Sequence, residues 1–107
     1  MASSKEYLNF ILEQLSEAEG VSTRAMMGEY LIYVRGTLIG GIYDDSFLIK
    51  PVPAALERMP NPELAEPYPG AKKLIVVDKL DDKRFLKELL EAVSDELSKS
   101  GVKHGRE

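Results

Sequence analysis

The sequence predicts an α+β fold, a two-layer sandwich in which an antiparallel β-meander packs against helices from both ends of the chain. Three observations lead to this prediction. Apolar residues recur at three- and four-residue steps near each end of the chain, which is typical of amphipathic helices. Residues 25–50 are apolar at both odd and even positions and contain two tight-turn sites. A proline-rich segment then precedes one more short apolar run. The expected order is α-β-β-β-α-(loop)-β-α in a single domain, 1–107.

The first helix is predicted over residues 5–19. Ser3 and Glu6 form a capping-box pattern, in which each side chain satisfies a free amide at the helix start. Gly20 suits the left-handed conformation that ends many helices. The residues that form one apolar stripe along this helix are Tyr7, Leu8, Ile11, Leu12 and Leu15.

A three-stranded meander follows. Its strands are expected over residues 25–34, 37–43 and 46–50. Arg35-Gly36 and Asp44-Asp45 are the expected two-residue turns, and such turns define the register of the strands. The predicted opposite pairs are Val34 with Thr37, Ile32 with Ile39, and Ile42 with Phe47.

The register divides the meander into two faces. The face taken as the core side holds Met27, Leu31, Tyr33, Leu38, Ile42, Phe47 and Ile49. The second face holds Tyr30, Ile32, Val34, Ile39, Tyr43 and Leu48, and ends at Lys50. On the second face, Tyr30, Ile32, Ile39 and Tyr43 form an amphipathic patch, and tyrosine is common on surfaces that bind partners. We expect either packing by the C-terminal helix or an interaction surface there.

The second half of the chain is expected to contain a short helix, a loop, a strand and a long helix. Pro53 suits the first turn of a helix over residues 54–59. PNPELAEPYPG, residues 60–70, is predicted to be a loop because prolines lack the amide donors of a strand. A buried strand is expected over 73–78, with its pairing undetermined. The last helix is predicted over 82–98 with Asp81 as its cap. The ordered core is expected over about 4–99, with a flexible tail over 100–107.

Composition excludes several kinds of chemistry. The chain has no cysteine and one histidine, His104, which falls in the predicted tail. A thiolate site, a histidine-based zinc site and a Ser-His-Asp triad are therefore excluded, and no cofactor, metal site or enzymatic activity is expected. The formal net charge of -4 disfavours direct nucleic-acid binding, which depends on clustered Lys and Arg. The N-terminal residues lack a secretory-signal pattern and no membrane-spanning run is present, so we expect a cytoplasmic protein.

A second group of residues is a candidate ligand neighbourhood. Arg24, Glu29, Lys50 and Tyr68 are expected to converge near one end of the sheet, beneath the proline-rich loop. Ordinary salt bridges and anchoring of that loop are the alternative interpretation.

The segment RAMMGEYLIYVRGTLIGGIYDDSFLIKP, with YPGAKKLIVVD and the last helix, resembles the amino-terminal domain of the TfoX/Sxy family of bacterial competence-associated proteins. The resemblance covers about residues 8–97. Met27 and Glu29 depart from the phenylalanine and glycine usual at those places, and we expect the protein to lack the separate C-terminal domain of longer members. The resemblance implies an α+β sandwich and a non-enzymatic regulatory role.

These observations predict a small regulatory or adaptor protein that binds a protein partner or a second copy of itself. Two alternatives remain at this stage. One is a nucleic-acid-associated regulator, as the competence link implies. The other is a small-molecule sensor that uses the candidate ligand neighbourhood.

Overall fold

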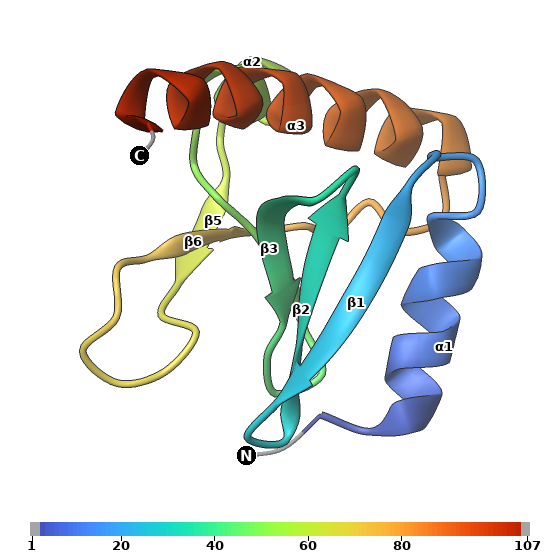
Figure 1. Ribbon diagram of the computed structural model, residues 1–107. Coiled ribbons are helices and arrows are strands. Elements are labelled where there is room, and N and C mark those ends of the chain that lie inside the picture. Colours follow the sequence, from blue (N-terminus) through green and yellow to red (C-terminus); the bar gives the residue numbers. More distant parts are fainter. Residues whose placement is uncertain (1–2, 106–107) are drawn as a thin grey trace.

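The structure, a computed structural model, describes residues 3–105 and, from residue 100 onward, only the backbone. It confirms the α+β class: a six-stranded antiparallel sheet with three helices, of which one precedes the sheet and one follows it (Figure 1). The elements are α1 (Lys5–Gln14), β1 (Val21–Met26), β2 (Glu29–Val34), β3 (Thr37–Ile42), β4 (Phe47–Ile49), α2 (Pro53–Arg58), β5 (Glu63–Ala65), β6 (Leu74–Val76) and α3 (Lys83–Gly105).

The first predicted strand is wrong, because a hairpin divides it. β1 pairs antiparallel with β2, and Met27 and Gly28 form the turn between them with φ values of 53° and 86°. A two-residue turn of this kind needs positive φ at both positions, which glycine adopts freely and methionine does not. The residue preferences of such turns therefore do not reveal a turn at Met27, and the sequence predicts a continuous strand there. The other two predicted turns are confirmed, with positive φ at Arg35, Gly36, Asp44 and Asp45.

The proline-rich segment also contains a strand, contrary to the prediction of a loop. β5 lies between Pro62 and Pro67 and pairs with β6, as in Leu64 opposite Ile75. Because β5 is the edge of the sheet, in the order β1-β2-β3-β4-β6-β5, the flanking prolines deprive no neighbouring strand of a donor. The undetermined pairing of the 73–78 segment is now defined: β6 runs antiparallel to both β4 and β5.

A β-bulge between β2 and β3 changes the predicted register. Val34 does face Thr37, and Ile42 does face Phe47, but Ile32 faces Gly40 rather than Ile39. Ile39 is the extra residue, so Ile39 and Gly40 lie on the same side of the sheet. Gly40 permits this arrangement, because a Cβ there would lie 2.1 Å from the Leu48 carbonyl oxygen.

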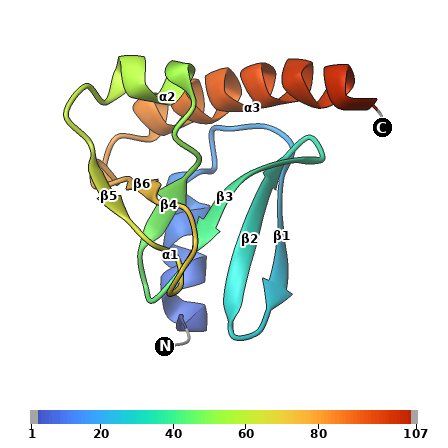
Figure 2. The ribbon, with the colours of Figure 1, turned by 90° about the vertical axis from the view of Figure 1, so that its left-hand side faces the viewer.

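The bulge exchanges the two predicted faces halfway along the meander. All three helices contribute to one core, so they cover the same face of the sheet, and Figure 2 shows α1 behind it. The sheet residues of this core are Ile32, Val34, Ile39, Ile42, Phe47, Ile49, Ile75 and Val77. The predicted core side is thus correct for Ile42, Phe47 and Ile49 and wrong for Met27, Leu31, Tyr33 and Leu38.

The helices begin and end at positions that differ from the predictions by different amounts. α1 ends at Gln14 rather than Glu19, and Ser4 is its N-cap, with the Ser4 side chain accepting from the Tyr7 amide at 3.0 Å. α2 begins at Pro53, in agreement with its predicted place. Asp82, not Asp81, caps the last helix and accepts the Phe85 amide at 3.0 Å.

α3 is longer than predicted. Its backbone is helical to Gly105, so residues 100–105 are not the tail that the sequence predicts. The rest of the predicted tail, 106–107, and the side chain of His104 lie outside the described residues. Within residues 3–105, no helix combines the length and apolar character needed to cross a membrane.

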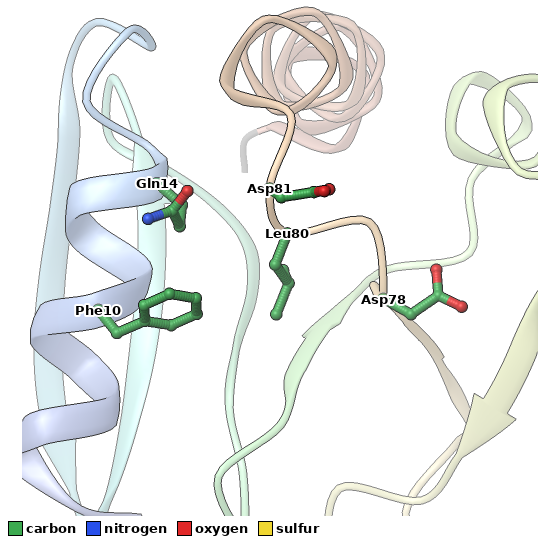
Figure 3. A pocket seen from close by; sticks show the side chains of 5 residues that line it. All are labelled: Phe10, Gln14, Asp78, Leu80 and Asp81. Atoms are coloured by element: carbon green, nitrogen blue, oxygen red, sulfur yellow. The ribbon is translucent and has the colours of Figure 1, made fainter.

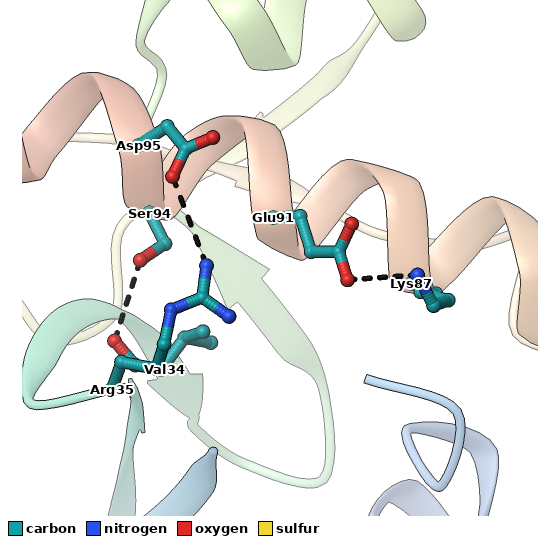
Figure 4. Close-up of polar contacts among 6 residues, drawn as sticks. All are labelled: Val34, Arg35, Lys87, Glu91, Ser94 and Asp95. Atoms are coloured by element: carbon teal, nitrogen blue, oxygen red, sulfur yellow. Dashed lines mark hydrogen bonds and ion pairs between the residues drawn. The ribbon is translucent and has the colours of Figure 1, made fainter. Parts of the chain in front are cut away.

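Polar contacts fasten α3 to the turn between β2 and β3 (Figure 4). The Ser94 hydroxyl donates to the Val34 carbonyl oxygen at 3.3 Å, and Ser94 is buried. Arg35 and Asp95 approach to 3.7 Å beside it, but both side chains are exposed, so this ion pair contributes little. Glu96 accepts the Ala54 amide at 2.9 Å and thereby joins α3 to the start of α2.

Candidate functional site

Within residues 3–105, no helix packs against one of the two faces of the sheet. Figure 2 looks onto this face, with α1 on the far side and the segment between β5 and β6 in front. We call it the helix-free face, and alternation along the strands places on it Arg24, Leu31, Tyr33, Leu38, Tyr43, Leu48, Lys50 and Val76. Leu31, Tyr33 and Leu38 are only half-buried. Leu48 is buried, so the half-buried part of this face lies over β2 and β3. Half-buried apolar side chains that no helix covers are the feature expected of an interaction surface.

The helix-free face is hollowed at one end into a pocket of about 660 Å³. We call it the methionine–tyrosine pocket, and its lining residues are Met26, Met27, Glu29, Tyr43, Pro67, Tyr68 and Pro69. Met27 is 95% exposed and Tyr68 is 59% exposed, which is unusual for large apolar side chains. The volume lies within the range of sites that bind small ligands or anchoring side chains of partners.

Tyr43 lines this pocket from the end of β3. Its ring packs over Gly41, where a Cβ would come within 2.9 Å of the ring. Burial, with smaller contributions from Tyr68, Glu29 and Tyr33, raises the pKa of the Tyr43 hydroxyl. The Tyr43 hydroxyl therefore stays protonated to a higher pH than that of a free tyrosine, and it joins Glu29 and Tyr68 as a polar group in the pocket.

Glu29 is held in place by hydrogen bonds from two distant segments. Its carboxylate accepts the Ser3 hydroxyl at 2.5 Å and the Asp44 amide at 3.2 Å. The Asp45 amide donates in turn to the Ser3 hydroxyl at 3.0 Å, and the Ser3 amide donates to the Gly28 carbonyl at 3.0 Å. These contacts hold the Glu29 side chain in the wall of the pocket, so Glu29 has a structural role as well.

The candidate ligand neighbourhood comes together only in part. Glu29 and Tyr68 line the same pocket, as the sequence predicts. Arg24 and Lys50 share the helix-free face but do not line the pocket. Lys50 is half-buried, and this burial lowers the pKa of its ammonium group.

The prediction of an interaction surface is wrong, because its four residues do not share one exposed face. These residues are Tyr30, Ile32, Ile39 and Tyr43. Ile32 and Ile39 are fully buried in the core, and Tyr30 packs against the same core. Tyr43 lies on the opposite face, on the far side of the bulge. The sequence signal that marks this region is Gly40-Gly41, because paired glycines within a strand indicate a bulge or a close backbone contact.

A second hollow, of about 470 Å³, lies between α1 and the chain segment that leads into α3 (Figure 3). Phe10, Gln14, Asp78, Leu80 and Asp81 line it. Figure 3 shows the carboxylates of Asp78 and Asp81 pointing away from Phe10, so the polar groups do not converge. Among the described residues, no group of three potential metal-ligating side chains is close enough to hold an ion. The methionine–tyrosine pocket is the stronger candidate site.

Comparison with known proteins identifies a relative of this chain. No family model matches the chain, and no solved structure matches it. The chain is 38% identical over 78 residues to a Spirochaeta aurantia protein described as an uncharacterized 12.7 kDa protein in the trpE 5′ region. The match covers 73% of this chain and 68% of the relative. The chain belongs to the family of this spirochaete protein. The description of this relative names no activity.

Proposed function

We propose that the protein is a non-enzymatic recognition module that binds another protein through the helix-free face. The observation that carries this proposal is the methionine–tyrosine pocket, in which two large side chains, Met27 and Tyr68, are exposed to solvent at one end of the helix-free face. Tyrosine and methionine are both enriched at protein interfaces. A module of this kind needs no catalytic group.

The resemblance to the TfoX/Sxy amino-terminal domain supports a regulatory role for that binding, and we include it in the proposal. The net charge of -4 favours a protein partner over a nucleic acid. A cytoplasmic location, which the cysteine-free composition permits, completes the proposal.

The test compares two substitutions that place a charge on an exposed apolar side chain. Met27→Glu changes the rim of the pocket, whereas Leu56→Glu changes α2, away from the helix-free face. Met27 and Leu56 are both exposed, so each variant is expected to fold, which circular dichroism would verify. Native-host lysate would be passed over the immobilised wild type and both variants, and retained proteins would be quantified by mass spectrometry.

The proposal expects at least one protein to be retained by the wild type and by Leu56→Glu, and to be lost with Met27→Glu. The retained protein would then be purified and its binding to the three forms measured by calorimetry. If no retained protein distinguishes Met27→Glu from Leu56→Glu, the pocket is not a recognition site.

A further inference from the structure

The two edges of the sheet are protected to very different extents. β5 has three residues, is bordered by Pro62 and Pro67, and carries Glu63. β1, at the other edge, has six residues, contains no proline and has Arg24 as its one charged residue. Figure 2 shows no described segment alongside the outer side of β1. Proline, charge and shortness are the usual means of blocking an edge, so β1 is open to pairing with another strand.

The register of the β1–β2 hairpin shows which backbone groups face outward. The Arg35 amide donates to the Gly20 carbonyl at 2.8 Å, so the even-numbered residues are those bonded to β2. In an antiparallel ladder the bonded and non-bonded pairs alternate. The amides and carbonyls of Val21, Thr23 and Ala25 therefore point away from the sheet, and none of them has a hydrogen-bond partner among the described residues.

We propose that a second copy of this chain pairs with β1, antiparallel, with Thr23 on the two-fold axis. In this register Thr23 faces Thr23 of the second copy, and Val21 faces Ala25. Each of the three outward-facing residues then meets another outward-facing residue, which allows six backbone hydrogen bonds. A register shifted by one pair in either direction allows only four.

The side chains of β1 favour this register and a second copy as the occupant. Arg24 comes to lie opposite Ser22 of the second copy, whereas the shift that pairs Thr23 with Ala25 would place Arg24 opposite Arg24. Like charges directly opposite each other are destabilising, and Thr–Thr pairs are favourable. Thr23 and Ala25 are small and exposed, so they present no steric barrier.

The inference goes beyond the proposed function, since it uses the edge of the sheet and not the pocket. A two-fold axis at this edge joins the two sheets into one and keeps both helix-free faces on the same side. The dimer would thus present two methionine–tyrosine pockets to a partner.

The first test is the mass of the purified chain by sedimentation equilibrium over a concentration series. We expect the mass to rise from 11.9 kDa toward twice that value. Thr23→Pro removes an outward amide and leaves the bonds to β2 in place, so it should weaken the dimer at least tenfold. Thr23→Val keeps the amide and should behave as the wild type. A wild type that stays monomeric throughout the series would overturn the proposal.

The second test does not depend on how Thr23→Pro folds. The chain has no cysteine, so a single introduced thiol reports only on its own position. Thr23→Cys should form a disulfide-linked dimer on mild oxidation, because facing Cα atoms in such a pair lie about 5.5 Å apart. Ala25→Cys should not, since its two copies would lie roughly 14 Å apart along the strands. Equal cross-linking of the two variants, or none with Thr23→Cys, would contradict the register.

Discussion

Gly40 lies so close to the backbone of β4 that no residue with a side chain fits in its place. A Cβ at this position would lie 2.1 Å from the Leu48 carbonyl oxygen and 2.8 Å from the Ile49 Cα, and both of these are backbone atoms that cannot rotate away. The bulge beside Gly40 therefore depends on the absence of a side chain, and the bulge decides which half of the meander faces the core.

Gly40→Ala should destabilise the protein by about 3 kcal/mol or more, because overpacking against fixed backbone forces β3 and β4 apart. Gly36→Ala is the matched control. Nothing lies within 4 Å of a Cβ at Gly36, so only its φ of +84° opposes the change, at a cost of about 1 kcal/mol. Urea unfolding followed by circular dichroism would measure both. Equal effects for the two variants would show that the contact at Gly40 is not limiting.

Tyr43 gives the candidate site a measurable pH dependence. Burial, then Tyr68, Glu29 and Tyr33, raise the pKa of Tyr43 from its ordinary value of 10.0. Below pH 10 this tyrosine is protonated in both the folded and the unfolded state, so it adds no pH dependence there. Above pH 10 the unfolded chain releases the proton first, and stability falls as pH rises through the folded pKa.

Between pH 8.5 and about pH 11, the melting temperature of the Tyr43→Phe variant should therefore fall less than that of the wild type. Tyr7, whose pKa is also raised by burial, remains in the variant and leaves part of the alkaline loss in place. Differential scanning calorimetry at several pH values would provide the comparison. An identical alkaline loss in the two proteins would mean that the Tyr43 hydroxyl is not in the buried setting described above.

At the scale of the element, a side-chain hydrogen bond caps the N-terminus of α3. The Asp82 carboxylate accepts the Phe85 amide at 3.0 Å, whereas the neighbouring Asp81 is exposed and makes no such bond among the described residues. Asp82→Ala should cost about 1 kcal/mol of stability through loss of the cap. Asp81→Ala should change it by less than about 0.5 kcal/mol. Chemical denaturation of the two variants would show which aspartate caps α3. A larger loss of stability for Asp81→Ala than for Asp82→Ala would mean that Asp81 is the cap, as the sequence pattern predicts.

The elements that the sequence predicts well are those with a strong local signal. The apolar stripe of α1, the Pro53 start of α2 and the Arg35-Gly36 and Asp44-Asp45 turns all depend on residues within one helical turn or hairpin of each other. Cap positions shift by one residue because adjacent serines or aspartates compete for the same role, and only the three-dimensional geometry separates them.

The elements that the sequence misses depend on tertiary contacts. Met27 accepts a positive φ, and β5 forms between prolines, because pairing with β2 and β6 compensates for poor local preference. The bulge at Ile39-Gly40 then explains the candidate site. Because of the bulge, Ile32 and Ile39 lie in the core while Tyr43 lies on the helix-free face. One extra residue in β3 thus separates Tyr43 from the other members of the predicted interaction surface.

At the scale of the whole molecule, a hydrogen-bonded clasp joins three parts of the chain that are far apart in sequence. Ser3 lies at the N-terminal end of the described chain, Glu29 begins β2, and Asp45 belongs to the turn between β3 and β4. Ser4 adds a bond from its amide to the Asp45 carboxylate at 2.8 Å. The clasp ties the approach to α1 to two hairpins and fixes the wall of the methionine–tyrosine pocket.

A double-mutant cycle of Ser3→Ala and Glu29→Ala should reveal a coupling of about 1–2 kcal/mol, since the bond between them is charge-assisted and shielded in part from water. The exposed Lys83–Glu13 pair, at 3.0 Å, is a suitable comparison, and its coupling should fall below about 1 kcal/mol. Urea unfolding of the four proteins in each cycle supplies both values. Because the clasp also holds Glu29 in the pocket, its loss should make the amides of residues 27–29 exchange faster with solvent, while those of α3 are unaffected. Additive Ser3 and Glu29 effects, with unchanged exchange at the hairpin, would mean that the three segments are held together by the core alone.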